Sequence, residues 1–202
     1  MFRPLKYLKQ NFTRFRDLML WRSRMYVAPA PQSVKHNVIL RNSLPGAVSI
    51  ETGTNTGSTS RILSSFSSKV FTLEPSTVLY LIAQKELKKF KNIEVINSTS
   101  EAYFSNLLAK IDGSVNFWLD GHYSGGQTYK NDINTPIVFE LEIIEKFLKE
   151  FKSVVVMIDD VRLFTNSEKL QNGYPSRRYL VDWATKNNLD WNIEFDIFVA
   201  KR

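Results

Sequence analysis

The chain has 202 residues, 43% of them hydrophobic, so it is long enough to bury a core and is not a disordered chain. It contains no cysteine, which excludes a disulfide framework and a thiolate metal site. No apolar run approaches the ~20 residues that a membrane-spanning helix needs, and the N-terminus lacks the apolar core of a secretory signal. We therefore expect a cytoplasmic protein.

The net charge of +7 belongs to the N-terminal fifth of the chain. Residues 1–41 contain nine Lys/Arg and one acid, whereas the other 161 residues contain eighteen bases and nineteen acids. A neutral body argues against a basic groove for nucleic acid. We therefore expect that the protein does not bind nucleic acid.

Residues 1–44 are predicted to form a basic helical extension. Within residues 2–24, apolar residues recur at spacings of three and four, as on one face of an amphipathic helix. These residues are Leu5, Leu8, Phe12, Phe15 and Met19. Prolines in 28–31 break this helix, and 33–44 is a second helical candidate. Three roles stay open for the first helix: it lies peripherally on a membrane, it docks on a second subunit or covers the site, or it packs on its own domain. The oligomeric state stays open with it.

From residue 45 onward, predicted strands and helices alternate. The strands are 47–51, 69–74, 93–96, 114–120 and 153–159, and the helices between them are 58–67, 76–90, 99–110 and 136–150. A helix at 176–187 and a strand-like run at 191–200 follow. Short β-rich runs separated by helices favour an α/β fold: a Rossmann-like, doubly wound, mostly parallel sheet of six to seven strands over residues 45–202.

The first strand leads into the turn Glu51-Thr-Gly-Thr-Asn-Thr-Gly57. Its glycines let the backbone approach a ligand without a Cβ in the way, and the N–H groups of the next helix point into the same space. The glycine spacing differs from the G-x-G-x-x-G of dinucleotide enzymes. A carboxylate at Glu51 would also repel a pyrophosphate but would bind the ammonium of a methionine moiety. The turn therefore favours S-adenosylmethionine over NAD.

Polar residues end the other predicted strands, at the edge where doubly wound sheets bind ligands. Glu74 ends the second strand about twenty residues after the glycine turn, where an acid accepts ribose hydroxyls. The alternative is a solvated glutamate at a strand end. Asn97 and Ser98 follow the third strand.

Three aspartates end the fourth and fifth strands: Asp120, Asp159 and Asp160. We expect these strands to be neighbours, so the carboxylates should converge and repel one another unless a cation neutralises them. Oxygen ligands favour Mg²⁺, with Mn²⁺ or Ca²⁺ as alternatives. The competing interpretation is that Asp160 only hydrogen-bonds the following loop.

His122 lies two residues after Asp120, and its ordinary pKa of about 6.5 suits a general base. It is equally well explained as an exposed loop residue. The polar segment 124–132 is a candidate for substrate contact. Three arginines are candidates for an anionic substrate group or are surface charges: Arg162, Arg177 and Arg178. His36 is interpreted as structural.

Residues 45–165 resemble the class I S-adenosylmethionine-dependent methyltransferases. The resemblance rests on E-T-G-T-N-T-G, on Leu-Glu74-Pro, on Leu119-Asp-Gly-His122 and on Ile158-Asp-Asp160. Within that superfamily, the chain resembles the macrocin O-methyltransferase and cephalosporin-hydroxylase-like group and uncharacterised bacterial relatives of surface-polysaccharide pathways. It departs at Asn97-Ser98, where many members carry an acid for the adenine amino group, so Ser98 is the candidate there.

The resemblance implies an enzyme that methylates a hydroxyl of a small acceptor, with a sugar as the leading candidate. The implied cofactor contacts are Glu51, Gly53, Thr54, Asn55, Gly57, Ser58, Glu74, Ser98 and Asp120. Asp120, Asp159 and Asp160 would hold magnesium, which would lower the pKa of the acceptor hydroxyl. Asp120 and His122 would act in catalysis. Two alternatives stay open: a nicotinamide-dependent oxidoreductase on the same fold, and a non-catalytic assembly protein at a membrane surface.

Overall fold

The computed structural model describes residues 3–121, 135–164 and 173–202, and describes side chains from residue 12 onward. Within these ranges, no helix is long and apolar enough to cross a membrane.

In the part of the chain that the structure describes, the centre is a seven-stranded sheet with the order β3-β2-β1-β4-β5-β7-β6. The strands are β1 (Val48–Thr52), β2 (Lys69–Leu73), β3 (Ile93–Ile96), β4 (Gly113–Leu119), β5 (Phe151–Ile158), β6 (Asp190–Glu194) and β7 (Ile197–Lys201). The first five pair in parallel, whereas β7 runs antiparallel to both β5 and β6. The predicted Rossmann-like, mostly parallel sheet is therefore confirmed, and so is the pairing of β4 with β5.

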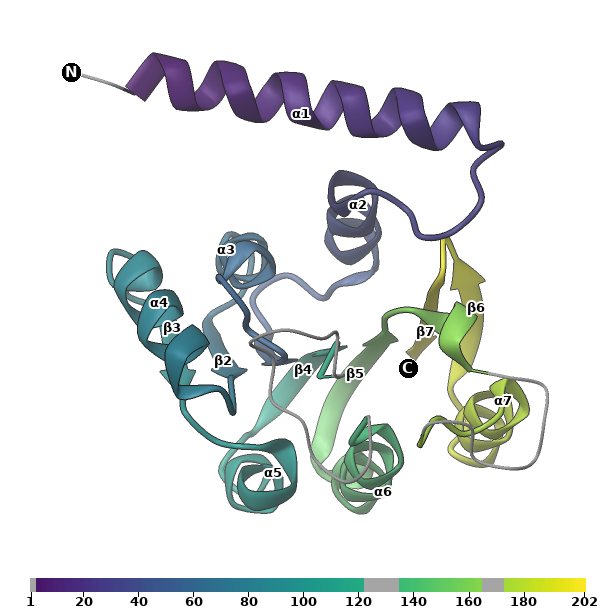
Figure 1. Cartoon of the computed structure of the whole chain (residues 1–202). Helices are drawn as coiled ribbons and strands as arrows, with labels where there is room; N and C mark the ends of the chain where they lie inside the picture. Colours follow the sequence, from purple (N-terminus) through teal and green to yellow (C-terminus); the bar gives the residue numbers. More distant parts are fainter. Residues whose placement is uncertain (1–2, 122–134, 165–172) are drawn as a thin grey trace.

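Helices cover both faces of this sheet. They are α1 (Arg3–Ser23), α2 (Gln32–Asn42), α3 (Ser58–Ser64), α4 (Thr77–Leu87), α5 (Ser100–Leu108), α6 (Ile137–Phe147) and α7 (Arg177–Lys186), with short 3₁₀ turns η1 (Leu148–Glu150) and η2 (Val161–Leu163). Figure 1 shows α2, α3 and α4 on one face and α5, α6 and α7 on the other, with α1 beyond α2 and α3. Layers on both faces explain why the parallel strands read as continuous apolar runs.

The two faces of the sheet bury separate apolar clusters, because successive strand side chains point to opposite faces. Phe117 of β4 lies in the cluster under α5, α6 and α7, and the next residue, Trp118, lies in the other. Val38 and Ile39 of α2 belong to the second cluster and are fully buried. Although α2 falls within the segment 1–44, it therefore packs directly on the sheet.

The C-terminal run 191–200 was predicted to be strand-like, and it is not one continuous strand. It forms the hairpin of β6 and β7 instead. Phe195 and Asp196 between them both have positive φ, at 46° and 74°, as the type I′ form of a two-residue hairpin turn requires. The dipeptide is not one of the usual Asn-Gly or Asp-Gly turns, so the sequence carried no signal for it.

Candidate functional site

The glycine turn after β1 lies against the end of β4. Gly53 has φ +85°, and a Cβ there would lie 2.4 Å from the carbonyl oxygen of Asp120. Gly57 caps α3 with φ +78°, and a Cβ there would lie 2.7 Å from Leu87 of α4. Both glycines are therefore required by contacts within the chain, independently of any ligand.

Glu51 is buried beneath the turn rather than exposed on it. Its Oε2 accepts hydrogen bonds from Ser60 Oγ and from Thr72 Oγ1, the latter at 2.7 Å. Burial raises the pKa of Glu51 to about 8, against the opposing effect of the two hydroxyls. At neutral pH the side chain is therefore mainly a neutral acid, whereas the sequence interpretation relied on a charged carboxylate.

Glu74, directly after β2, connects this strand to the glycine turn. Its Oε2 accepts the backbone N–H of Asn55 at 2.8 Å, and its Oε1 accepts that of Ser76 at 3.0 Å. Burial raises the pKa of Glu74, and the two N–H groups act in the opposite direction. Asn97 Nδ2 donates to the Glu74 carbonyl oxygen at 2.8 Å, whereas Ser98 Oγ donates to its neighbour's carbonyl oxygen. The turn and the acid predicted to hold a ribose thus lie together.

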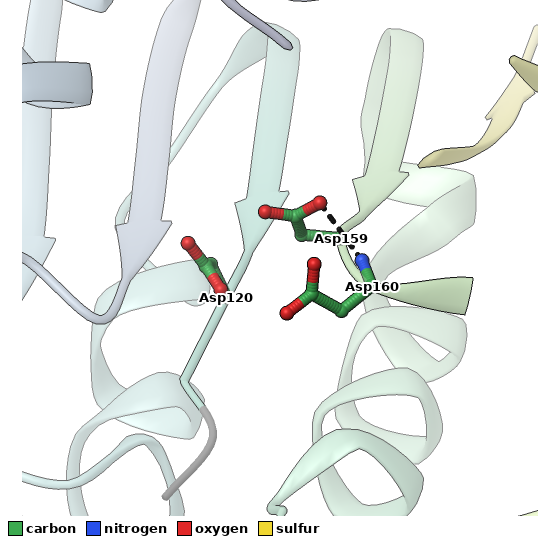
Figure 2. Close-up of side chains that lie close together, drawn as sticks. All are labelled: Asp120, Asp159 and Asp160. Carbon is green, nitrogen blue, oxygen red and sulfur yellow. Dashed lines mark hydrogen bonds between the residues drawn. The ribbon is translucent and has the colours of Figure 1, made fainter. Parts of the chain in front are cut away.

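The three aspartates predicted to converge do so. Asp120 follows β4, and Asp159 and Asp160 follow β5. Each offers a carboxylate oxygen within 4.8 Å of the others, and Figure 2 shows the three groups gathered beyond the two strand ends. Asp159 Oδ1 also accepts the backbone N–H of Asp160 at 2.8 Å. Burial, together with the charge of Asp120, raises the pKa of Asp159 to about 7.

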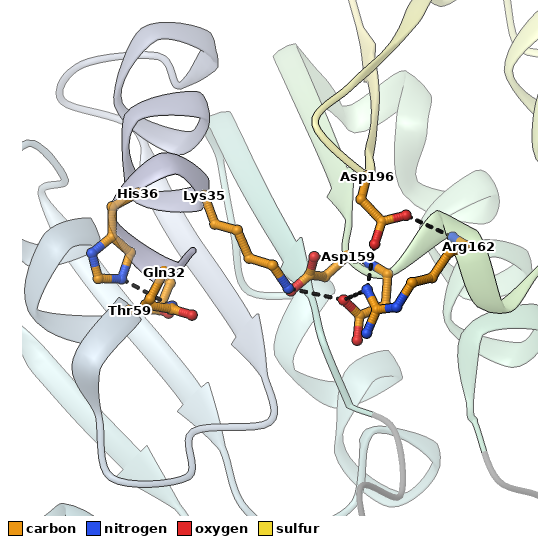
Figure 3. A network of polar contacts seen from close by, with 8 residues as sticks. Gln32, Lys35, His36, Thr59, Asp159, Arg162 and Asp196 are labelled. Carbon is orange, nitrogen blue, oxygen red and sulfur yellow. Dashed lines mark hydrogen bonds and ion pairs between the residues drawn. The ribbon is translucent and has the colours of Figure 1, made fainter. Parts of the chain in front are cut away.

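A lysine that the sequence interpretation missed contacts this cluster. Figure 3 shows Lys35 extending from α2 toward Asp159. Its Nζ donates to Asp159 Oδ2 at 2.5 Å and to Asp160 Oδ1 at 2.8 Å. Burial alone would lower the pKa of Lys35, but the two carboxylates outweigh it and raise that pKa. Because Lys35 lies more than a hundred residues from its partners in the chain, no local pattern could have revealed this contact.

Arg162 continues the network on the other side (Figure 3). Its Nη1 donates to Asp160 Oδ1 at 2.5 Å and to Asp196 Oδ2, and its backbone N–H donates to Asp196 Oδ1 at 2.7 Å. Burial acts to raise the pKa of Asp160, but Arg162 and Lys35 outweigh burial and hold that pKa below its usual range. Arg162 is therefore part of a half-buried ion-pair network and not a simple surface charge.

The cluster suits a hard cation by its donors, since three carboxylates converge on one place. The Lys35 ammonium, however, already contacts oxygens of two of these three side chains. A metal would therefore compete with Lys35 for Asp159 Oδ2 and Asp160 Oδ1. The residues fit magnesium only if Lys35 leaves those oxygens.

A small cavity of about 10 Å³ lies beside the cluster, lined by Asp120, Asp159, Glu140 and Tyr174 among others. Glu140 lies on α6, and its burial raises its pKa to about 8, opposed by the hydroxyls of Ser100 and Thr52. The sequence interpretation missed Glu140, although a signal existed. It occupies the i+3 position after Ile137, within the apolar stripe of the predicted helix.

Some of the other candidates predicted from the sequence lie outside the described residues, and others have contacts that the structure describes. His122 and the segment 124–132 lie outside the described residues. His36 contacts Gln32 on its own helix, and burial lowers its pKa to about 4, in keeping with the structural role predicted for it. Arg177 donates to the Val161 carbonyl oxygen at 3.3 Å.

No family model and no curated protein matches the sequence. Solved structures match over most of the chain. An rRNA methylase from Streptococcus thermophilus has a TM-score of 0.50 at 14% identity and covers 87% of this chain and 96% of its own. The N-methyltransferase NodS from Bradyrhizobium japonicum WM9 has 0.54 at 11%, covering 83% and 92%. Precorrin 8w decarboxylase from Methanobacterium thermoautotrophicum has 0.51 at 11%, covering 87% and 91%. The chain shares the Rossmann-like fold of these solved structures. The named activities of the three differ, so the fold does not by itself specify a reaction.

Proposed function

We propose that the protein is an S-adenosylmethionine-dependent methyltransferase. The observation that carries this proposal is the strand order. The classic dinucleotide-binding sheet has the order 3-2-1-4-5-6. Here an antiparallel β7 lies between β5 and β6, and the solved structures with a matching fold include methyltransferases. The nicotinamide-dependent alternative is therefore less well supported than methyl transfer.

The cofactor would lie across the ends of β1 and β2. Glu74 would accept the ribose hydroxyls, because a carboxylate has further acceptor sites besides the two that bind backbone N–H groups. The methionine end would lie near Glu51 and Gly53. Ser98 and Asp120 would make further contacts. The glycine turn and the start of α3 would contribute Thr54, Asn55, Gly57 and Ser58. S-adenosylmethionine would supply the methyl group.

The acceptor would lie at the ends of β4 and β5, where the acids gather. Carboxylates accept hydrogen bonds from hydroxyl groups, which favours a small hydroxylated acceptor such as a sugar, and O-methylation of it. Asp120, Asp159 and Asp160 are the residues that would hold magnesium, which would lower the pKa of a bound hydroxyl. His122 is proposed as the base that takes the hydroxyl proton. The membership of the macrocin-like, surface-polysaccharide group is part of the same proposal.

A ligand-stabilisation experiment tests the cofactor. S-adenosylhomocysteine at a hundred times its Kd should stabilise the protein by ~2.7 kcal/mol, and NAD(P) should not. Glu74→Gln should weaken this effect, since it removes the carboxylate. Glu94→Gln, an exposed glutamate on β3 paired with Lys69, is the matched control and should leave it unchanged. Stabilisation by NAD(P) alone would contradict the proposal.

A transfer assay tests the acceptor and the metal. Label from methyl-labelled S-adenosylmethionine should appear in a nucleotide-sugar or hydroxylated-metabolite panel, and EDTA should abolish it if magnesium is required. Ribosomal RNA belongs in the panel, because one protein of the same fold is an rRNA methylase. Label in RNA alone would replace the sugar with RNA as the acceptor. Undiminished turnover in EDTA would remove the metal from the proposal.

A further inference from the structure

Helix α1 lies outside the two helical layers of the domain, beyond α2 and α3 (Figure 1). Among the side chains described on α1, Trp21 is the buried one. Its Nε1 donates to the Val27 carbonyl oxygen at 3.1 Å, and its ring meets Tyr26 and Phe195 edge-on at 5.1 and 5.5 Å. The aromatic contact fixes the C-terminal end of α1 to the β6–β7 hairpin and sets which face of the helix points inward.

The opposite face of α1 carries an apolar stripe. Phe12, Phe15 and Met19 are 72%, 64% and 48% exposed. At about 100° per residue, these three side chains lie within about 60° of one another around the helix axis. Trp21 lies about 120° to 180° away from them. The stripe therefore faces away from the domain that Trp21 contacts, and in the sequence Leu5 and Leu8 continue its spacing.

Basic residues border this stripe. Arg16 and Arg22 are exposed and lie on either side of it, about 40° and 80° from Phe12. The helix has six Lys/Arg and a single acid, Asp17, which pairs with Arg16 at 3.0 Å. Long basic side chains can run along an apolar surface and keep their charge in water. An outward apolar stripe flanked by cations fits a surface that has anionic groups on the outside and an apolar layer beneath them.

Other occupants fit these observations less well. If a second copy paired through the same stripe, its arginines would face those of the first, and the single acid of α1, Asp17, already pairs with Arg16 of its own helix. Nucleic acid would match the charge but would leave two exposed phenylalanines and a methionine without an apolar partner. We propose that α1 docks the protein on an anionic membrane surface, with Phe12, Phe15 and Met19 at the acyl boundary and Arg16 and Arg22 at the headgroups.

Vesicle cosedimentation of the full chain tests this. The protein should bind phosphatidylcholine vesicles that contain about one third phosphatidylglycerol, bind pure phosphatidylcholine at least tenfold more weakly, and lose affinity as salt rises. Phe12→Ser with Phe15→Ser should lower the partition coefficient by about tenfold or more. Val78→Ser with Leu81→Ser is the matched control. These residues of α4 are also exposed, at 53% and 56%, and their loss should not change binding.

A second variant separates charge from apolar contact. Arg16→Gln with Arg22→Gln should weaken binding to anionic vesicles and reduce its salt dependence, whereas Lys85→Gln on α4 with Lys88→Gln directly after it should have a smaller effect. Equal binding to neutral and anionic vesicles would overturn the proposal. So would vesicle binding that the phenylalanine variant leaves intact. If the wild-type protein dimerises without vesicles and the phenylalanine variant is monomeric, the stripe binds a second copy instead.

Discussion

The two halves of the candidate site satisfy their buried acids in different ways. At the ends of β1 and β2, Glu51 and Glu74 are bound by neutral donors, namely hydroxyls and backbone N–H groups. At the ends of β4 and β5, Asp159 and Asp160 are bound by cations. Both sets lie at one edge of one sheet, so the difference arises from the neighbouring strand, helices and loops that supply the donors there.

This contrast separates two kinds of electrostatic environment. Neutral donors offset burial only in part, so the pKa of Glu51 rises to about 8 and the group is largely uncharged at neutral pH. Two cations offset burial more fully at Asp160, so the pKa of Asp160 falls and the group stays charged. Among the described residues, Lys35 is the one cation that contacts Asp159, which also lies near Asp120, and the pKa of Asp159 rises to about 7. The proposed cofactor half is therefore held mainly by neutral polar groups, and the proposed acceptor half is an ion-pair network centred on Lys35.

The largest expected effect is the removal of the Lys35 charge. Lys35→Met keeps much of the side chain's length but leaves two buried carboxylates without their shared partner, which should lower the free energy of unfolding by about 3–5 kcal/mol. Lys69→Met is the control, because its pair with Glu94 is much more exposed and should contribute no more than about 1 kcal/mol. Urea unfolding at pH 7 measures both.

The same variant decides between lysine and metal as the cation of the cluster. If the aspartates can hold a divalent ion, Mn²⁺ or Mg²⁺ should restore part of the stability of Lys35→Met and should bind it more tightly than the wild-type protein. Isothermal titration of Mn²⁺ into both proteins measures this. Equal or absent binding in both would mean that the cluster is an ion-pair network without a metal role.

The sequence predicted most of the acidic residues of this site but not the groups that bind their carboxylates. Periodicity located the strands, and parallel strands align their carboxyl ends, so the convergence of Asp120 with Asp159 followed directly. The contact of Lys35 depends on how α2 packs through Val38 and Ile39, which a single sequence does not show. Glu140 was easier to predict, because a glutamate within the apolar stripe of a helix must either be buried with that stripe or be turned out of the core.

A second expected effect concerns the glycine turn that joins the two halves. Gly53→Ala places a Cβ 2.4 Å from the backbone oxygen of Asp120, in a left-handed conformation, so stability should fall by about 2–4 kcal/mol. Gly46→Ala is the control: it has a similar φ of +76° but no atom within 4 Å, and should cost about 1–2 kcal/mol. Thermal unfolding compares them, and equal losses would mean that the approach of the turn to β4 is not tight.

The smallest expected effect is the pH dependence caused by Glu140. It tests whether the buried Glu140 side chain is a neutral acid. The pKa of Glu140 is about 8 in the folded protein against an ordinary 4.5. Between these values the unfolded chain has released a proton that the folded chain keeps, so stability should fall as the pH rises, by about 1.4 kcal/mol per pH unit. Glu140→Gln cannot titrate and should lose this part of the slope in urea unfolding between about pH 5.5 and 7.5. Glu142→Gln, exposed on the same helix, should keep it. Because Glu51 and Asp159 also have raised pKa values, of about 8 and about 7, the Glu140 variant should retain a slope from both groups, and Glu51→Gln in the same background should reduce that slope further. An unchanged slope in Glu140→Gln would mean that Glu140 is charged in the folded protein and that the neutral character inferred for this buried acid is wrong.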